Sequence, residues 1–152
     1  MSTGDLVKTE EFDILLKRAV EFHGHLGPFL VLGLRIGLAG LRELKIRREE
    51  RELQVTAKLQ YSIPFSCAVD GLQISTKCTM GNKRLQVMDY SGIETKFELE
   101  KGKEVTVAVD SAFLNMLKRR LPSESVPSEK ISELGWLVAY APEKELFTVS
   151  RG

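Results

Sequence analysis

The chain contains two histidines, His23 and His25, and they are separated by a single glycine. In an extended segment, residues i and i+2 point to the same side, so both imidazoles could bind one metal ion. On a helix they would lie about 200° apart and could not share an ion. Gly24 favours a turn and Pro28 prevents a helix from continuing, so the chelating geometry is available. The alternative is a pair of ordinary surface or core histidines, since His-x-His alone is a weak motif.

Two cysteines, Cys67 and Cys78, are the remaining soft metal ligands. If residues 66–77 form one helix, the two thiols lie on the same face but about 16 Å apart along the axis. A disulfide requires Cα atoms within about 7 Å, and one ion could not bind both thiols because thiolate–metal bonds are about 2.3 Å long. We therefore expect one cysteine to join the histidines. We favour Cys67, because a helix N-terminus stabilises a thiolate, and we expect Cys78 to be a buried small hydrophobe.

Two polar residues follow Cys67 at intervals of one helical turn. Asp70 could be a fourth ligand, a partner that orients a histidine, or a base. Gln73, one turn further on, could form a hydrogen bond with a ligand. Each also fits the alternative of an ordinary polar residue on a helix surface. The candidate site therefore comprises three metal ligands (His23, His25 and Cys67) and three surrounding residues (Asp70, Gln73 and Cys78).

Three predicted helices must position these residues. Apolar residues recur at helical spacing over residues 10–22, and Pro28 suits the first position of a second helix over residues 28–45. That second helix is apolar on nearly every side, which is typical of a helix that is buried all round. Ser66 can cap the third helix, over residues 66–77. Three glycines lie on one strip of the second helix, where another helix could approach closely in a homodimer or within the monomer: Gly33, Gly37 and Gly40.

The rest of the chain alternates strands and helices without the regular βαβ order of a parallel sheet. This pattern predicts an α+β fold with a mixed, largely antiparallel sheet packed with helices. We expect a single domain over residues 10–152, after a frayed N-terminus at residues 1–9. The expected strands are one at 53–60, a hairpin of 84–90 and 93–100 around Ser91-Gly92, a strand that ends at Val109 after a turn at 101–103, and a closing strand at 146–149. The expected helices are one to Arg120, capped by Asp110 or Ser111, and a last one to Tyr140, capped by Ser128.

The composition excludes several classes of function. Hydrophobic residues make up 43% of the 152 residues, charged residues 28%, and the net charge is +1. Such a balance provides no basic patch for nucleic acid or for an anionic membrane. The longest apolar stretch, residues 28–41, contains Arg35 and is too short to span a bilayer. We see no apolar signal region near the start, and two cysteines do not make a disulfide framework, so we expect a cytoplasmic location.

Two motifs resemble those of a known family. Residues 22–28, with the sequence FHGHLGP, and the apolar helix after them resemble the opening motif of the FmdE family. That family is named after the E component of molybdenum and tungsten formylmethanofuran dehydrogenases. Residues 67–73, with the sequence CAVDGLQ, are similar to its second signature. Further similarity lies in residues 76–81, Asp89-Tyr90, Phe97 and residues 141–149, so the resemblance covers residues 10–150 approximately.

The resemblance implies an α+β fold, a tendency to form homodimers, and a site for zinc or another divalent transition metal. The histidine motif and Cys67 would supply the ligands. Three departures from the family pattern stand out. Gly27 replaces a usual cysteine, which weakens any thiol redox chemistry, and Lys77 replaces a usual glycine. We also expect this protein to lack the C-terminal cysteine-rich zinc module of many members, which would remove a docking element for a protein or cofactor.

Three functions are compatible with these features. The first is a metal-binding protein accessory to molybdenum or tungsten formylmethanofuran dehydrogenase, or to related cofactor metabolism, with components of that enzyme as candidate partners. The second is a zinc-dependent enzyme acting on an unknown small molecule, with Asp70 as acid or base. The third is a non-catalytic dimeric interaction module, in which an ion fastens residues 22–28 to the helix starting at residue 66. No molybdopterin site and no iron–sulfur cysteine run is recognisable in the sequence.

Overall fold

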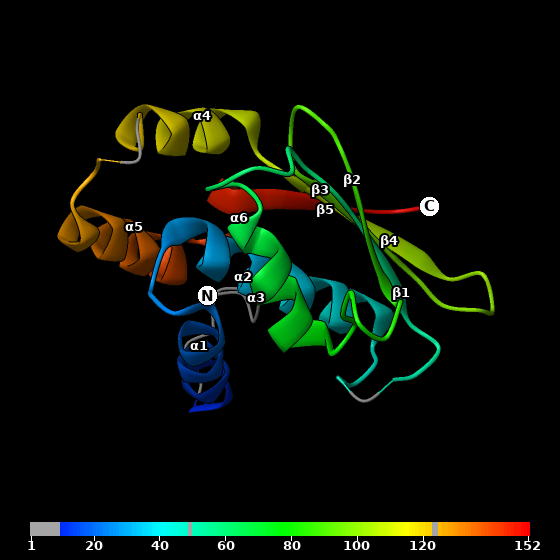
Figure 1. Ribbon diagram of the computed structural model, residues 1–152. Coiled ribbons are helices and arrows are strands. Elements are labelled where there is room, and N and C mark those ends of the chain that lie inside the picture. The colour runs from blue at the N-terminus through cyan, green and yellow to red at the C-terminus, as the bar shows by residue number, and fades with distance from the viewer. Residues whose placement is uncertain (1–9, 49, 123–124) are drawn as a thin grey trace.

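The computed structural model describes residues 10–48, 50–122 and 125–152. In these ranges helices and a five-stranded mixed sheet form the α+β fold that the sequence predicts (Figure 1). The frayed start predicted for residues 1–9 lies outside the described residues. The elements are α1 Glu10–His23, α2 Pro28–Leu44, β1 Gln54–Lys58, α3 Cys67–Thr76, β2 Leu85–Met88, β3 Glu94–Glu98, β4 Glu104–Val109, α4 Ser111–Arg120, α5 Ser128–Tyr140, α6 Glu143–Leu146 and β5 Phe147–Arg151.

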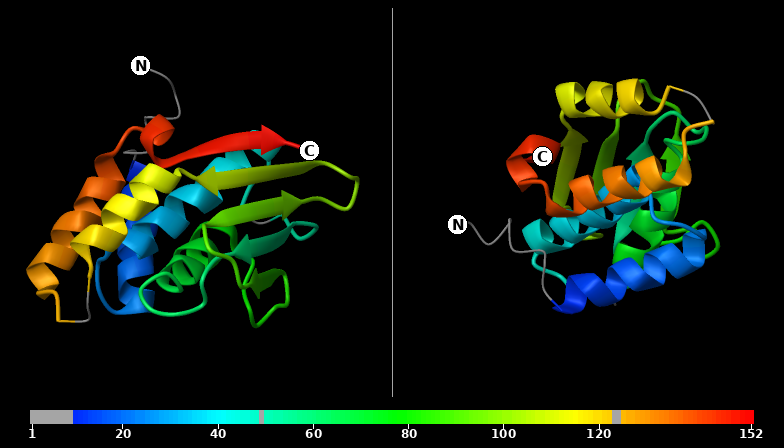
Figure 2. Two further views of the ribbon diagram at one scale, coloured as in Figure 1. Left: turned by 90° about the horizontal axis from the view of Figure 1, so that it is seen from above. Right: turned by 90° about the vertical axis from the view of Figure 1, so that its left-hand side faces the viewer.

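Helix α2 lies at the centre of the molecule. It contacts α1, α3 and α5, and it also packs on β3 and β4 (Figure 2). Pro28 occupies its first turn, and residues such as Phe29 and Leu32 are at most 1% exposed. The burial on all sides that the sequence predicts is thereby confirmed. Among the described helices, none combines the length and the apolarity that a membrane span requires.

The glycine strip of α2 serves packing within the chain. A Cβ atom at Gly33 would overlap the carbonyl oxygen of Ala68 on α3. In the same way, a Cβ atom at Gly71 of α3 would overlap the carbonyl oxygen of Leu30 on α2. Further along the strip, a Cβ atom at Gly37 would overlap a side chain of α3. The two backbones are therefore in direct contact, and this contact sets the position of α3 relative to α2.

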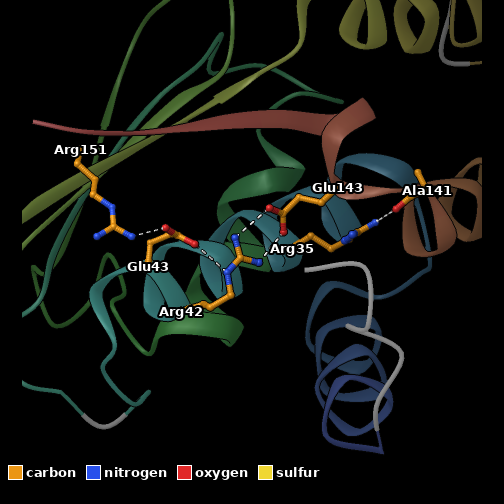
Figure 3. Close-up of polar contacts among 6 residues, drawn as sticks. All are labelled: Arg35, Arg42, Glu43, Ala141, Glu143 and Arg151. Atoms are coloured by element: carbon orange, nitrogen blue, oxygen red, sulfur yellow. Dashed lines mark hydrogen bonds and ion pairs between the residues drawn. The ribbon is translucent and has the colours of Figure 1, made fainter. Parts of the chain in front are cut away.

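A buried arginine on α2 holds the end of α5. Arg35 is 2% exposed and donates a hydrogen bond of 2.9 Å to the carbonyl oxygen of Val138. It donates a second hydrogen bond to the carbonyl oxygen of Ala141 (Figure 3). Carbonyl groups at the end of a helix have no partner within the helix, so a cationic donor is well placed there. Arg35 thereby joins α2 to the last turn of α5.

An ion-pair network continues from α2 toward the C-terminus. Arg42 forms two hydrogen bonds with Glu143 of α6, at 2.6 and 2.9 Å, and a third with Glu43. Glu43 also accepts a hydrogen bond of 2.7 Å from Arg151 of β5 (Figure 3). Because Arg42 and Glu143 meet in the two-point geometry of a guanidinium and a carboxylate, this pair is strong and directional. It fixes α6, a short helix that the sequence analysis did not predict.

The sheet has the strand order β2-β1-β3-β4-β5, and only the β1–β2 pair is parallel. The hairpin predicted for residues 84–90 and 93–100 is wrong, because β2 and β3 lie on opposite sides of β1. The chain leaves β1 through α3 and returns in the same direction as β2, which is the crossover that a parallel pair requires. The turn predicted at residues 101–103 is confirmed, since it joins β3 to β4 with Gly102 at a φ of +90°.

The predicted helix caps are partly confirmed. Asp110 accepts a hydrogen bond of 2.9 Å from the backbone N–H of Phe113 and so caps α4. Ser66 occupies the cap position of α3, but its side chain forms no capping hydrogen bond. Ser128 is the first residue of α5, and the cap position belongs to Pro127, so the prediction of a serine cap was wrong there.

Candidate functional site

A cavity of about 830 Å³ lies where the end of α1, the start of α2, the segment before α3 and the end of α4 meet. Its wall includes all three residues predicted as metal ligands, His23, His25 and Cys67. It is open to solvent at one edge, since Ile63 is 74% exposed. The other residues of the wall are Gly27, Pro28, Phe29, Leu30, Gln60, Pro64, Phe65, Lys118, Leu121, Pro122 and Ile131.

His23 is held by the carboxylate of Asp70, which lies 47 positions later in the sequence. The Nδ1 atom of His23 is 2.6 Å from Oδ2 of Asp70. A carboxylate accepts the Nδ1 proton and leaves the lone pair of a neutral ring on Nε2. The Nε2 atom is buried, and it has no hydrogen-bond partner among the described residues. Of the three roles open for Asp70 in the sequence, its position fits the partner that orients a histidine.

His25 lies beside His23, after the turn at Gly24, where φ is +107°. The centroids of the two rings are 4.7 Å apart, and the ring planes are inclined by 43°. Partial burial lowers the pKa of His25, and the neighbouring His23 lowers this pKa further. Both effects favour the neutral imidazole, which is the form that binds metal ions.

Cys67 is the first residue of α3. Burial raises the pKa of its thiol, and the negative charge of Asp70 one turn away raises this pKa further. The prediction that the helix N-terminus stabilises a thiolate here was therefore wrong for the metal-free protein. Loss of hydration and a nearby carboxylate outweigh the helix dipole.

The two remaining candidates lie away from the cavity wall. The amide nitrogen of Gln73 donates to Oδ1 of Asp70 at 3.2 Å, and its amide oxygen accepts from the backbone N–H of Met80 at 3.0 Å. Gln73 therefore positions Asp70. Cys78 is fully buried, and its sulfur lies 3.5 Å from the carbonyl oxygen of Leu53. Its prediction as a buried small hydrophobe is confirmed, and both cysteines are free.

Gly27 lies at the cavity wall, at the position where the family pattern usually has a cysteine. Its backbone is extended, with φ at −153°, a conformation open to any residue. A Cβ atom on Gly27 would lie 3.6 Å from Nε2 of His25 and 3.2 Å from a methyl group of Ile131. A side chain at this position would therefore begin beside His25 and Ile131. Lys77, where the sequence also departs from the usual glycine, follows the last residue of α3. Its φ is +64°, a conformation that favours glycine.

Part of the cavity wall, formed by Phe65 and Lys118, was not predicted from the sequence. The ammonium group of Lys118 lies 5.5 Å from the centroid of the Phe65 ring. The Phe65 ring in turn packs edge-on against Phe29, with centroids 5.2 Å apart. Phe65 could have been suspected from its place two residues before Cys67. Lys118 gave no signal, because only the tertiary packing of α4 brings it to the cavity.

The candidate ligands share one wall but do not yet surround a common point. Within the three described ranges of the chain, no group of three or more His, Cys, Asp or Glu side chains is arranged to hold a metal ion. The arrangement does provide one oriented imidazole whose Nε2 has no partner among the described residues, a second imidazole beside it, and a thiol on the same cavity. Imidazole and thiol groups are the ligand types that zinc prefers in proteins.

A family model and a relative both match this chain. The family model described as "FmdE, Molybdenum formylmethanofuran dehydrogenase operon" matches residues 22–148. A relative from Archaeoglobus fulgidus, named "Probable S-adenosyl-L-methionine-binding protein", is 30% identical over 148 residues. The match covers 86% of this chain and 40% of that relative, so the chain spans less than half the relative's length.

A solved structure has the same fold. It is the crystal structure of a protein from Syntrophus aciditrophicus described as "tungsten formylmethanofuran dehydrogenase subunit e (fmde)-like protein", and it superposes with a TM-score of 0.55. The similarity covers 92% of this chain and 71% of that chain, at 18% sequence identity. At this level of identity the likeness supports the α+β fold alone.

Proposed function

The chain belongs to the FmdE family, and on that premise we propose that it binds zinc or another divalent transition metal through His23, His25 and Cys67. One observation carries the proposal: the buried Nε2 of His23 has no partner among the described residues, while Asp70 holds the other nitrogen. Buried polar atoms in proteins nearly always have a partner. A histidine between a carboxylate and a metal ion is a common arrangement, so an ion at Nε2 would satisfy this atom.

The other two ligands would complete the site if their side chains turned toward Nε2 of His23. His25 presents a neutral imidazole beside His23, and Cys67 would release its thiol proton when an ion binds. Three protein ligands would leave a fourth position open toward the cavity. That is how zinc sites that bind or transform small molecules are built, whereas purely structural zinc sites have four protein ligands.

The cavity favours a function that involves a small molecule. Its volume of about 830 Å³ falls in the range of typical ligand pockets and far exceeds the space that an ion needs. We therefore favour a metal-binding protein that handles a small molecule, accessory to formylmethanofuran dehydrogenase or related cofactor metabolism. A zinc-dependent enzyme is the second candidate, and the same cavity supports it. The interaction module, which needs no cavity, is supported least.

Metal content is the direct test of the proposal. Protein purified without a histidine tag is expected to contain about one zinc per chain, before or after zinc is supplied, by elemental analysis. Cys67→Ala is expected to lose most of this metal, because it removes the only thiol on the cavity wall.

The matched control is Cys78→Ala, which removes the buried thiol outside the cavity wall and should retain the metal. The absence of metal from the wild-type protein under both conditions would refute the proposal. If the two cysteine variants lost equal amounts of metal, the loss would be due to general destabilisation of the protein.

Gly27→Cys is expected to strengthen metal binding. The new thiol would project from a Cβ atom 3.6 Å from Nε2 of His25 and could become a fourth ligand. We expect zinc affinity to rise by about tenfold or more, measured by competition with a chromophoric chelator. Gly27→Ala adds the same Cβ atom without sulfur, so it should not increase the affinity. Equal affinities of the two variants would show that residue 27 does not reach the ion.

A further inference from the structure

The polarity of the cavity wall points to the charge of its ligand. Lys118 is the one wall residue with a permanent charge, and none of the described residues of the wall is an aspartate or a glutamate. The remaining polar members are the two histidines, Gln60 and Cys67. A cationic ligand would find no carboxylate there, whereas an anionic ligand would find an ammonium group.

The ammonium group of Lys118 is available to a ligand. It lies over the Phe65 ring, and no carboxylate of the described residues forms an ion pair with it. A lysine that faces an aromatic ring instead of a carboxylate keeps most of its capacity to attract an anion, since a cation–π contact is weak and leaves the ammonium group its charge. Lys118 therefore supplies an electrostatic anchor at the wall formed by α4.

The rest of the wall is suited to an apolar or aromatic body. Phe29 and Phe65 form an edge-to-face pair at this wall, and Leu121 and Ile131 also line the cavity. We infer that the cavity binds a small organic anion, whose charged group lies beside Lys118 and whose apolar or aromatic body packs against Phe65, Leu121 and Ile131. This inference rests on the proposed function, because the ligand would occupy the cavity that the ion shares.

Two fluorescent dyes of similar shape separate charge from apolar contact. We would titrate chelator-treated protein with 1-anilinonaphthalene-8-sulfonate, an anion, and with N-phenyl-1-naphthylamine, its neutral counterpart. The anionic dye is expected to bind with one site per chain, and about tenfold more tightly than the neutral dye. Lys118→Met should abolish this preference, weakening the anionic dye about tenfold and the neutral dye less than twofold.

Arg119→Met provides the matched control, since it removes the same charge from the next residue of α4, which is exposed and outside the cavity wall. It should leave both affinities unchanged. Lys118→Gln, measured in parallel, keeps the test valid if the methionine variant fails to fold. Equal affinities of the two dyes for the wild-type protein, failure of both to bind, or an equal loss of both in the Lys118 variants would overturn the inference.

The dye titration and the metal analysis can fail separately. Because the dyes are tested without metal, a missing anion preference would leave the proposed metal site intact. Conversely, a metal-free wild-type protein could still show the preference for the anionic dye.

Discussion

His23→Ala is expected to lower zinc affinity by about 100-fold or more. The substitution removes the one imidazole whose orientation the structure fixes and whose Nε2 atom lacks a partner among the described residues. Loss of a carboxylate behind a metal-bound histidine typically reduces affinity by about 10- to 100-fold, and loss of the ligand itself should have a larger effect. Competition titration of chelator-treated protein against a chromophoric chelator, at fixed pH, measures this affinity.

Asp70→Asn provides a graded variant for the same titration. The amide oxygen of asparagine can still accept the proton on Nδ1 of His23, but without the negative charge, so an intermediate loss of about tenfold is expected. Asp110→Asn is the matched control, since Asp110 caps α4 and does not line the cavity. An unchanged affinity in His23→Ala, or equal losses in Asp70→Asn and Asp110→Asn, would contradict the proposed role of the histidine.

The helices that carry the site were predictable because local sequence determines them. Pro28 can begin a helix but cannot continue one, and Gly24 provides the left-handed turn between α1 and α2. The partners of the strands were not predictable in the same way. Apolar and polar residues alternate in β2 and in β3, which indicates that each is a strand. One face of each strand would be buried whether the two formed a hairpin or lay on opposite sides of β1. The crossover through α3 decides between these two arrangements, and this crossover depends on how α3 packs.

The site shows the same division between local and tertiary information. Residue type and spacing selected His23, His25 and Cys67, and all three line one cavity. The ionisation of Cys67 was predicted wrongly, because a helix N-terminus can be read from the sequence whereas burial and the approach of a carboxylate depend on the fold. Lys118 reaches the cavity only through the packing of α4, so no local pattern could have identified it.

Gly33→Ala is expected to destabilise the protein by about 3 kcal/mol or more. A methyl group on Gly33 would overlap the backbone carbonyl oxygen of Ala68, which cannot move unless the whole of α3 moves. The gain in helix propensity, about 1 kcal/mol, is too small to compensate. Urea unfolding of the metal-free protein, followed by circular dichroism, measures the change in the free energy of unfolding.

The same substitution should also weaken the candidate site. Cys67 belongs to α3, whereas His25 lies three residues before the start of α2, so separating the two helices would move the thiol away from His25. Gly81→Ala is the matched control, because the nearest atom to its added Cβ would be 3.8 Å away, and its stability should change by about 0.5 kcal/mol at most. If Gly33→Ala were as stable as Gly81→Ala, the direct contact between α2 and α3 could not be what fixes the geometry of the cavity.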